Sequence, residues 1–221
     1  MKHALVIGAS GGIGSAISTE LSARGYGVTG LSRSADGLDV TDEASVKAAL
    51  SDVNQPMSLI FVATGALEPG GHRPEKALRE VTPAALEAAF RINAIGPLLV
   101  LKHSLHLLPK NAPSVFAALS ARVGSIGDNG IGGWHSYRAS KTALNQLIHG
   151  AAIELKRTHK QASAVCLHPG TVETSFTEKY ASRHKTVPAP QAAANRVNVI
   201  EGLTPAQSGG FFDYAAQKIP W

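Results

Sequence analysis

Cysteine is almost absent from this sequence, since Cys166 is the only one among 221 residues. A single cysteine excludes an internal disulfide and fits a reducing compartment, so a cytoplasmic protein is expected. No uninterrupted apolar run is long enough to span a bilayer, and the first predicted strand begins directly after Met1-Lys2. The sequence therefore predicts no membrane span, no signal peptide and no association with membranes.

Aromatic residues are also scarce, at 5%, and basic residues outnumber acidic ones, which gives a net charge of +5 and a pI of about 9.4. Because Lys and Arg are scattered and few aromatics are available to stack on bases, the charge does not predict a nucleic-acid partner. An anionic small molecule explains it equally well. The nine histidines include His103 and His106, but no acidic or cysteine ligand accompanies them, so no metal site is expected.

The most informative stretch is the N-terminal one. An apolar run at residues 4–7 predicts a buried strand, and apolar residues spaced four apart from Ile13 predict a helix. The turn between them follows G-x-x-x-G-x-G, at Gly8, Gly12 and Gly14. A strand, glycine turn and helix in this order present backbone N–H groups and a helix dipole to a phosphate. The pattern favours a dinucleotide site over a glycine-rich turn without a ligand.

The residues after the second predicted strand, at 26–31, indicate which dinucleotide is preferred. An acidic residue here would bind the ribose hydroxyls of NAD, and none follows directly. Ser32 and Arg33 stand there instead, and a guanidinium matches a 2′-phosphate in charge and geometry. A solvated loop arginine is the alternative. The sequence thus predicts NADP(H) as the preferred cofactor, with NAD(H) possible.

Strand and helix patterns alternate along the whole chain. This predicts an α/β fold: a single doubly wound, Rossmann-type domain over residues 1–221, with a parallel sheet flanked by helices on both faces. Strands are expected at 4–7, 26–31, 38–40, 58–63, 114–119, 162–167 and 210–214. The helix after the third strand is expected to be capped by Thr41, and the helical run 82–108 to break near Gly96-Pro97.

A second informative stretch is Tyr137-x-x-x-Lys141, on a helix predicted over residues 136–157. Residues at i and i+4 are neighbours on a helix, so the phenol and the ammonium point the same way. A nearby Lys⁺ favours the phenolate and would bring the pKa of the tyrosine toward neutrality. The pair therefore predicts a general acid that protonates a carbonyl oxygen, or a base that deprotonates an alcohol.

In these motifs the chain resembles the short-chain dehydrogenase/reductase family over nearly its whole length, and most of all a small bacterial branch similar to C-factor-type cell–cell signalling proteins. The resemblance implies that Asp39 meets the adenine, Lys141 the nicotinamide ribose, and that Asn93 holds a water in a proton relay. It also implies that residues 169–174 close over the cofactor. Phe176, Tyr180 and His184 are expected to shape the substrate pocket.

Two departures from the family pattern stand out. The N-N-A-G segment reads Val62-Ala63-Thr64-Gly65, and the Ser-Ser pair that carries the catalytic serine reads Ser120-Ala121. We expect Ser125, twelve residues before Tyr137, to supply the missing hydroxyl, with Ser120 as the alternative.

Together these features predict an oxidoreductase that transfers a hydride between NADP(H) and a small carbonyl or alcohol substrate, with Tyr137 as acid/base. The alternative is an NAD(P)-binding regulatory or signalling protein with little turnover. A homodimer or homotetramer is expected, through the wide apolar surfaces of residues 94–108 and 136–157. The residues expected in catalysis are Tyr137, Lys141, Ser125 and Asn93. Those expected to bind the cofactor are Gly8, Ser10, Gly11, Gly12, Ile13, Gly14, Ser32, Arg33, Asp39, Val40, Thr64, Gly65, Tyr137, Lys141, Pro169, Gly170, Val172 and Thr174.

Overall fold

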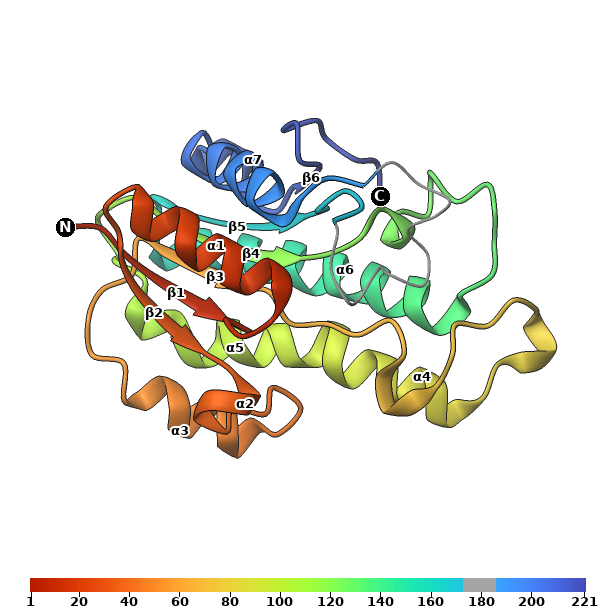
Figure 1. Cartoon of the computed structure of the whole chain (residues 1–221). Helices are drawn as coiled ribbons and strands as arrows, with labels where there is room; N and C mark the ends of the chain where they lie inside the picture. Colours follow the sequence, from red (N-terminus) through yellow and green to blue (C-terminus); the bar gives the residue numbers. More distant parts are fainter. Residues whose placement is uncertain (173–185) are drawn as a thin grey trace.

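Six parallel strands form one sheet in the computed structural model, which describes residues 1–172 and 186–221 (Figure 1). The spatial order is β2-β1-β3-β4-β5-β6. The strands are β1 (His3–Ile7), β2 (Gly27–Leu31), β3 (Leu59–Val62), β4 (Ser114–Leu119), β5 (Ala162–Leu167) and β6 (Phe211–Phe212). The predicted α/β fold class is confirmed. Thr174, Phe176, Tyr180 and His184 lie outside the described residues.

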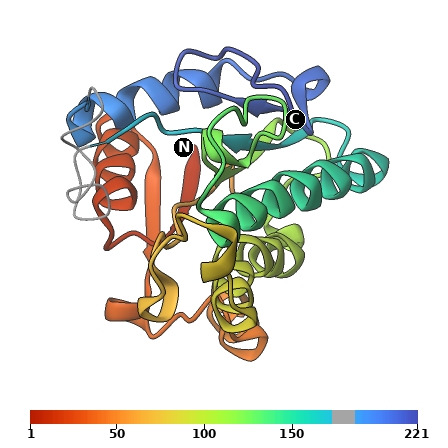
Figure 2. The same ribbon diagram turned by 90° about the vertical axis from the view of Figure 1, so that its right-hand side faces the viewer.

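Helices cover both faces of this sheet. Figures 1 and 2 show α1 and α7 on one face and α3, α5 and α6 on the other. Their bounds are α1 (Gly12–Ala23), α2 (Arg33–Asp36), α3 (Glu43–Ser51), α4 (Pro83–Phe90), α5 (Gly96–Ser104), α6 (His135–Thr158) and α7 (Ala189–Glu201). Successive side chains of a strand point to opposite faces of the sheet, so the side chains of β1 are shared between two cores. Leu5 and Ile7 join the core beneath α3, α5 and α6, whereas Ala4 and Val6 join the core beneath α1 and α7.

Residues 38–40 do not form the third strand that the sequence predicted. The Asp39 carboxylate accepts hydrogen bonds from the backbone N–H (2.8 Å) and the hydroxyl (2.7 Å) of Thr41, and the Asp39 N–H donates to Ser45 Oγ. These local bonds take the place of ladder bonds. The sheet therefore ends at β2, although Leu38 and Val40 are buried. Asp42, rather than the predicted Thr41, caps α3, since its carboxylate accepts from the Ala44 N–H.

The helical run that begins at Pro83 is continuous, and the break predicted near Gly96-Pro97 does not occur. A π-helical turn, Arg91–Ile95, joins α4 to α5 without interrupting the helix. By length and composition alone, Pro83–Leu107 is long and apolar enough to cross a membrane. In the structure it packs against α3 and α6 as a core helix, with 44% of its most apolar window buried. Ile95 and Leu105 are the large apolar side chains of this run that are exposed.

Candidate active site

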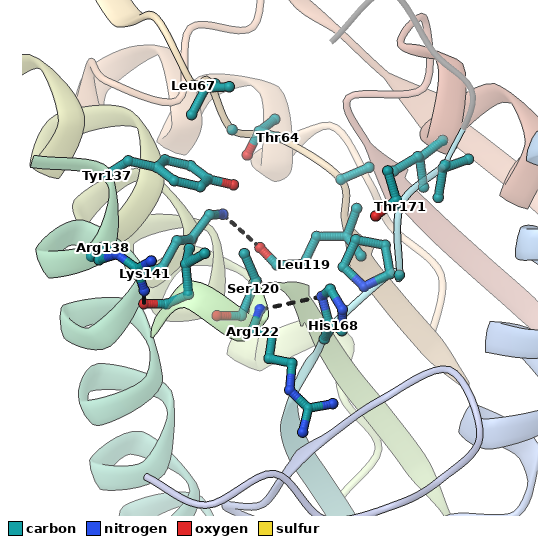
Figure 3. Close-up of a pocket in the computed structure, with 18 of the residues that line it drawn as sticks. Thr64, Leu67, Leu119, Ser120, Arg122, Tyr137, Arg138, Lys141, His168 and Thr171 are labelled. Atoms are coloured by element: carbon teal, nitrogen blue, oxygen red, sulfur yellow. Dashed lines mark hydrogen bonds between the residues drawn. The ribbon is translucent and has the colours of Figure 1, made fainter. Parts of the chain in front are cut away.

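A cavity of about 690 Å³ opens at the carboxyl ends of β1, β3, β4 and β5 (Figure 3). In an open parallel sheet this edge binds ligands where the strand order reverses, here between β1 and β3. Of the residues predicted from the sequence, those that line the cavity are Gly11, Gly12, Ile13, Gly14, Thr64, Gly65, Tyr137, Lys141, Pro169, Gly170 and Val172, together with the alternative Ser120. Those that do not are Gly8, Ser10, Ser32, Arg33, Asp39, Val40, Asn93 and Ser125.

The conformation of the glycine turn after β1 allows a ligand to approach its backbone closely. Gly8 has φ +85°, and its N–H donates to Leu31 O at 2.7 Å, which ties the turn to β2. A Cβ on Gly14 would lie 2.1 Å from Gly8 O, so only glycine lets α1 begin this close to the turn. Gly11 caps α1 with no side-chain hydrogen bond. A helix leaves its first N–H groups without intrahelical partners, and here the residues that carry them, Gly12, Ile13 and Gly14, line the cavity. These features fit the diphosphate of a dinucleotide.

Tyr137 and Lys141 project into the cavity from successive turns of α6 (Figure 3). Both are nearly buried, at 8% and 3% exposure. The Lys141 ammonium donates to Leu119 O at 2.8 Å, and burial lowers the pKa of Lys141 to about 8. Burial raises the pKa of the Tyr137 phenol. The direction is opposite to the lowered Tyr137 pKa that the sequence predicted, because burial disfavours the charged phenolate.

A carboxylate from outside α6 fixes the start of this helix. Trp134 precedes α6 in a left-handed conformation (φ 50°) and provides no side-chain cap. The buried Glu75 supplies one instead, since it accepts from the Ser136 N–H (3.2 Å) and the Ser136 hydroxyl. Burial opposes ionisation of Glu75, but these hydrogen bonds outweigh it and its pKa is lowered. This cap holds the turn on which Tyr137 stands.

Asn93 lies in the π-helical turn and is fully buried behind the cavity. Its amide donates to Ala66 O (2.9 Å) and Ser140 Oγ (3.1 Å), and its Oδ1 accepts from the Ala66 N–H (2.9 Å). Both amide hydrogens are thus committed to the protein. The side chain braces the turn after β3 against α6.

The structure does not bring Ser125 to the cavity, contrary to our prediction. Its hydroxyl donates to Pro220 O at 2.6 Å and accepts from the Asp128 N–H, so it ties the loop after β4 to the chain near residue 220. Ser120 lines the cavity, but its hydroxyl donates to Asn145 Oδ1 at 2.7 Å. Ala121 has no hydroxyl. Neither serine therefore offers its proton to a group beside Tyr137.

His168 lines the cavity opposite Tyr137 and was missed from the sequence (Figure 3). Its Nδ1 accepts from the Arg122 N–H at 3.2 Å. Burial first, then the charges of Arg122 and Arg196, lower the pKa of His168 to about 4, so the ring is neutral at physiological pH. The only sequence signal was its position at the end of β5, directly before Pro169-Gly170. Further lining residues that the sequence did not reveal are Ala63, Leu67, Leu119, Ala121, Arg122, Val123, Asp128, Ile131, Trp134, Arg138 and Thr171.

The end of β2 carries the residues expected to select the cofactor. The Asp36 carboxylate turns back to accept from the Ser32 N–H at 2.8 Å, so it caps its own short helix. Arg33 is exposed, and Ser34 donates to Ser10 Oγ at 3.0 Å, which joins this segment to the glycine turn. Arg33 thus stands at the solvent edge of the turn, outside the cavity itself.

A doubly wound parallel sheet, a glycine turn at its switch point and a buried Tyr–Lys pair beside that turn define a Rossmann-type dinucleotide-binding oxidoreductase. The family model for short chain dehydrogenases matches residues 2–185. The chain belongs to the short-chain dehydrogenase/reductase family.

Two curated relatives and two solved structures illustrate the similarity. The C-signal protein of Myxococcus xanthus is 38% identical over 145 residues, which cover 66% of this chain and 84% of that protein. A 1-hydroxy-2-glutathionyl-2-methyl-3-butene dehydrogenase of Rhodococcus sp. (strain AD45) is 33% identical over 239 aligned residues, 100% of both chains. An NADP-bound short-chain dehydrogenase/reductase of Burkholderia multivorans (TM-score 0.82, 22% identical) and an NADPH-bound carbonyl reductase from chicken fatty liver (TM-score 0.84, 21% identical) each cover 100% of this chain and 99% of their own. At these identities the two structures show the shared fold.

Proposed function

We propose that this protein reduces small carbonyl compounds, or oxidises the corresponding alcohols, with NADP(H) and with Tyr137 as the acid/base. The observation that carries the proposal is the placement of Tyr137 and Lys141 in one cavity with the glycine turn. When bound, the reduced nicotinamide supplies a hydride to the carbonyl carbon. Tyr137 donates its phenolic proton to the carbonyl oxygen, and Lys141 stabilises the negative charge left on the phenol.

Two properties of Lys141 suit it to this role. With a pKa of about 8 it is mostly protonated at neutral pH, and its hydrogen bond to Leu119 O fixes the ammonium beneath the cavity. The hydrogen bonds of Asn93 to Ala66 and Ser140 fix the position of α6 relative to the turn after β3. Tyr137 and Lys141 thus meet a substrate in a fixed orientation.

The cavity wall indicates the class of substrate. Leu67, Ile131, Trp134 and Val172 are among its apolar residues, and Ile131 is 92% exposed at the surface. We therefore expect apolar aldehydes or ketones to be better substrates than sugars. The Rhodococcus relative named above acts on a glutathionyl-substituted alcohol, and the neighbour from chicken is a carbonyl reductase. The test is oxidation of NADPH, followed by its absorbance, with a panel of aliphatic, aromatic and glutathionyl carbonyl compounds.

Arg33 carries the proposed preference for NADPH. We expect Arg33→Ala to weaken NADPH binding about 10- to 100-fold and to leave NADH binding unchanged, because a charge-assisted hydrogen bond contributes roughly 1.5–3 kcal/mol. Binding is measured by quenching of protein fluorescence. Arg157→Ala, at an exposed arginine near the end of α6, is the matched control. Equal dissociation constants for the two cofactors in the unmodified protein would contradict the assignment.

The second prediction concerns assembly. α5 and α6 lie side by side (Figure 2), and the exposed side chains on this pair and its ends include Ile95 (44%), Leu105 (38%) and Ile153 (55%). We propose that this surface pairs with a second copy, since burying one such side chain contributes about 1.5–3 kcal/mol. Sedimentation should show a mass at least twice 23.0 kDa, and Ile153→Glu should reduce it. A 23.0 kDa species alone at micromolar concentration would exclude a homodimer or homotetramer.

A regulatory protein with little turnover is the second candidate function. The observation that favours it is the similarity to the Myxococcus C-signal protein, together with Ala121 at the place of the family serine. The carbonyl panel separates the two candidates, because a regulator binds NADPH without oxidising it. In either case we propose a cytoplasmic location, where reduced dinucleotide is available.

A further inference from the structure

The proposed reaction leaves a negative charge on Tyr137, and neither of the two serines considered from the sequence is placed to stabilise it. Ala121 has none, and the hydroxyls of Ser120 and Ser125 donate to Asn145 Oδ1 and Pro220 O. Burial disfavours a phenolate at this position. We therefore looked for a donor other than these two serines on the cavity wall that Tyr137 shares.

Thr64, at the turn after β3, holds a hydroxyl that the fold does not use. Its Oγ1 is buried, and it has no hydrogen-bond partner among residues 1–172 and 186–221. The Thr64 methyl group lies against Gly8, 3.2 Å from the position of a Cβ there. Figure 3 shows the Thr64 oxygen turned toward the phenolic oxygen of Tyr137. A buried hydroxyl without a partner is costly, and in native proteins it calls for a functional explanation.

The next residue places Thr64 in the reacting region. A Cβ on Gly65 would lie 3.1 Å from Asn93 Oδ1 and 3.3 Å from Lys141 Nζ. The turn at Thr64-Gly65 therefore packs directly on the ammonium that accompanies Tyr137. Hydrogen bonds of this kind are often long in a ligand-free site and shorten when the substrate binds.

We propose that the Thr64 hydroxyl donates a hydrogen bond to the phenolic oxygen of Tyr137 as that oxygen becomes a phenolate, and so replaces the missing serine of the family. The inference rests on the proposed function. The O–H bond of Tyr137 breaks and a new O–H bond forms on the substrate oxygen, while the hydride from bound NADPH completes the alcohol. The charge left on Tyr137 is then shared between the Thr64 hydroxyl and the Lys141 ammonium.

Thr64→Val tests this directly, because valine keeps the shape and removes the hydroxyl. We expect kcat for carbonyl reduction to fall about 10- to 100-fold, the usual effect of losing one hydrogen bond to a charged group. Thr64→Ser should retain kcat within a few-fold. The pH above which reduction declines should rise by about one to two units, since a less stabilised phenolate forms at higher pH. The ionisable residues that line the cavities around Tyr137 are unchanged in both variants; within the described residues they are His72, Arg73, Glu75, Arg122, Asp128, Arg138, Lys141 and His168.

A second readout needs no cofactor. Removing an unpartnered buried hydroxyl relieves an unmet hydrogen bond, so the melting temperature of ligand-free Thr64→Val should equal or exceed that of the unmodified protein. Thr158→Val is the matched control, because the Thr158 hydroxyl hydrogen bonds to His159 Nδ1 at 2.8 Å, far along α6. This control should not raise the melting temperature, and its kcat should not change.

The outcomes distinguish failure of this inference from failure of the proposed function. If Thr64→Val keeps full kcat, or if it only weakens NADPH binding, the hydroxyl serves no phenolate and the inference is overturned while the reductase stands. A lower melting temperature in Thr64→Val would show that the hydroxyl is structural, which also overturns it. If the unmodified protein reduces no carbonyl compound, the proposed function fails first and the inference falls with it.

Discussion

Tyr137→Phe should abolish carbonyl reduction and leave the fold and the binding of NADPH intact. Phenylalanine fills the same space in the cavity wall but has no proton to give to the carbonyl oxygen. The phenol is nearly buried at 8% exposure, so bulk water is poorly placed to replace it. A positioned general acid contributes about 10²–10⁴ in rate, and we expect a loss of kcat in this range, or about 3–5 kcal/mol.

The measurement is steady-state oxidation of NADPH with the best aldehyde of the panel, beside a separate binding titration. Tyr26→Phe is the matched control. The Tyr26 hydroxyl donates to Glu201 Oε1 at 3.0 Å, away from the cavity, so its removal should leave kcat unchanged. If Tyr137→Phe keeps more than a tenth of the activity, the proton comes from another group and the assignment of Tyr137 as the acid is wrong.

Gly14→Ala should be the most damaging single change to the cofactor site. The added methyl would lie 2.1 Å from Gly8 O and 2.8 Å from Gly8 C, both backbone atoms that cannot rotate away. The start of α1 must therefore move off the turn, and its first N–H groups, which we expect to bind the diphosphate, move with it. Overpacking of this kind costs typically about 1–3 kcal/mol in stability. We expect NADPH binding to become undetectable at micromolar concentration.

Gly150→Ala provides the comparison for Gly14→Ala. Gly150 is exposed on α6, and nothing lies within 4 Å of a Cβ added there. Alanine is favoured over glycine in a helix by about 0.8–1.0 kcal/mol, so this variant should melt at a higher temperature and bind NADPH normally. Thermal unfolding and a binding titration of both variants decide the matter. Normal NADPH binding by Gly14→Ala would mean that the glycine turn does not hold the diphosphate.

The fold was predictable because its signals are local and repeated. Buried parallel strands give short apolar runs, and those of β1, β4 and β5 were predicted to within one residue of each end. The segment 38–40 was not predictable, because it has the apolar pattern of a strand. Whether it forms a strand depends on side-chain hydrogen bonds between Asp39 and Thr41, which compete with the hydrogen bonds of a β-ladder. The continuous helix through Gly96-Pro97 was missed because a π-helical turn absorbs the irregularity.

The site was predictable where sequence spacing fixes geometry, and not elsewhere. The glycine turn lies at the start of a helix, and Tyr137 and Lys141 lie on successive turns of another helix. Their positions therefore follow from the sequence spacing. Ser125 lies in a loop of irregular conformation, where counting residues back from Tyr137 does not give a direction. Its partner is Pro220, 95 residues away, which no local pattern could reveal. The inward hydroxyl of Thr64 and the imidazole of His168 depend on tertiary packing in the same way.

Transfer of a deuteride is the measurement that tests the central claim most directly. The protein is incubated with NADPH that carries deuterium at both C4 positions of the nicotinamide and with the best carbonyl substrate of the panel. Mass spectrometry then counts deuterium in the isolated alcohol. A carbonyl reductase gives one deuterium on the carbinol carbon of every product molecule, and Tyr137→Phe gives almost no product. Alcohol without deuterium, or NADPH that is bound and never consumed by any carbonyl compound, would contradict hydride transfer as the function of this chain.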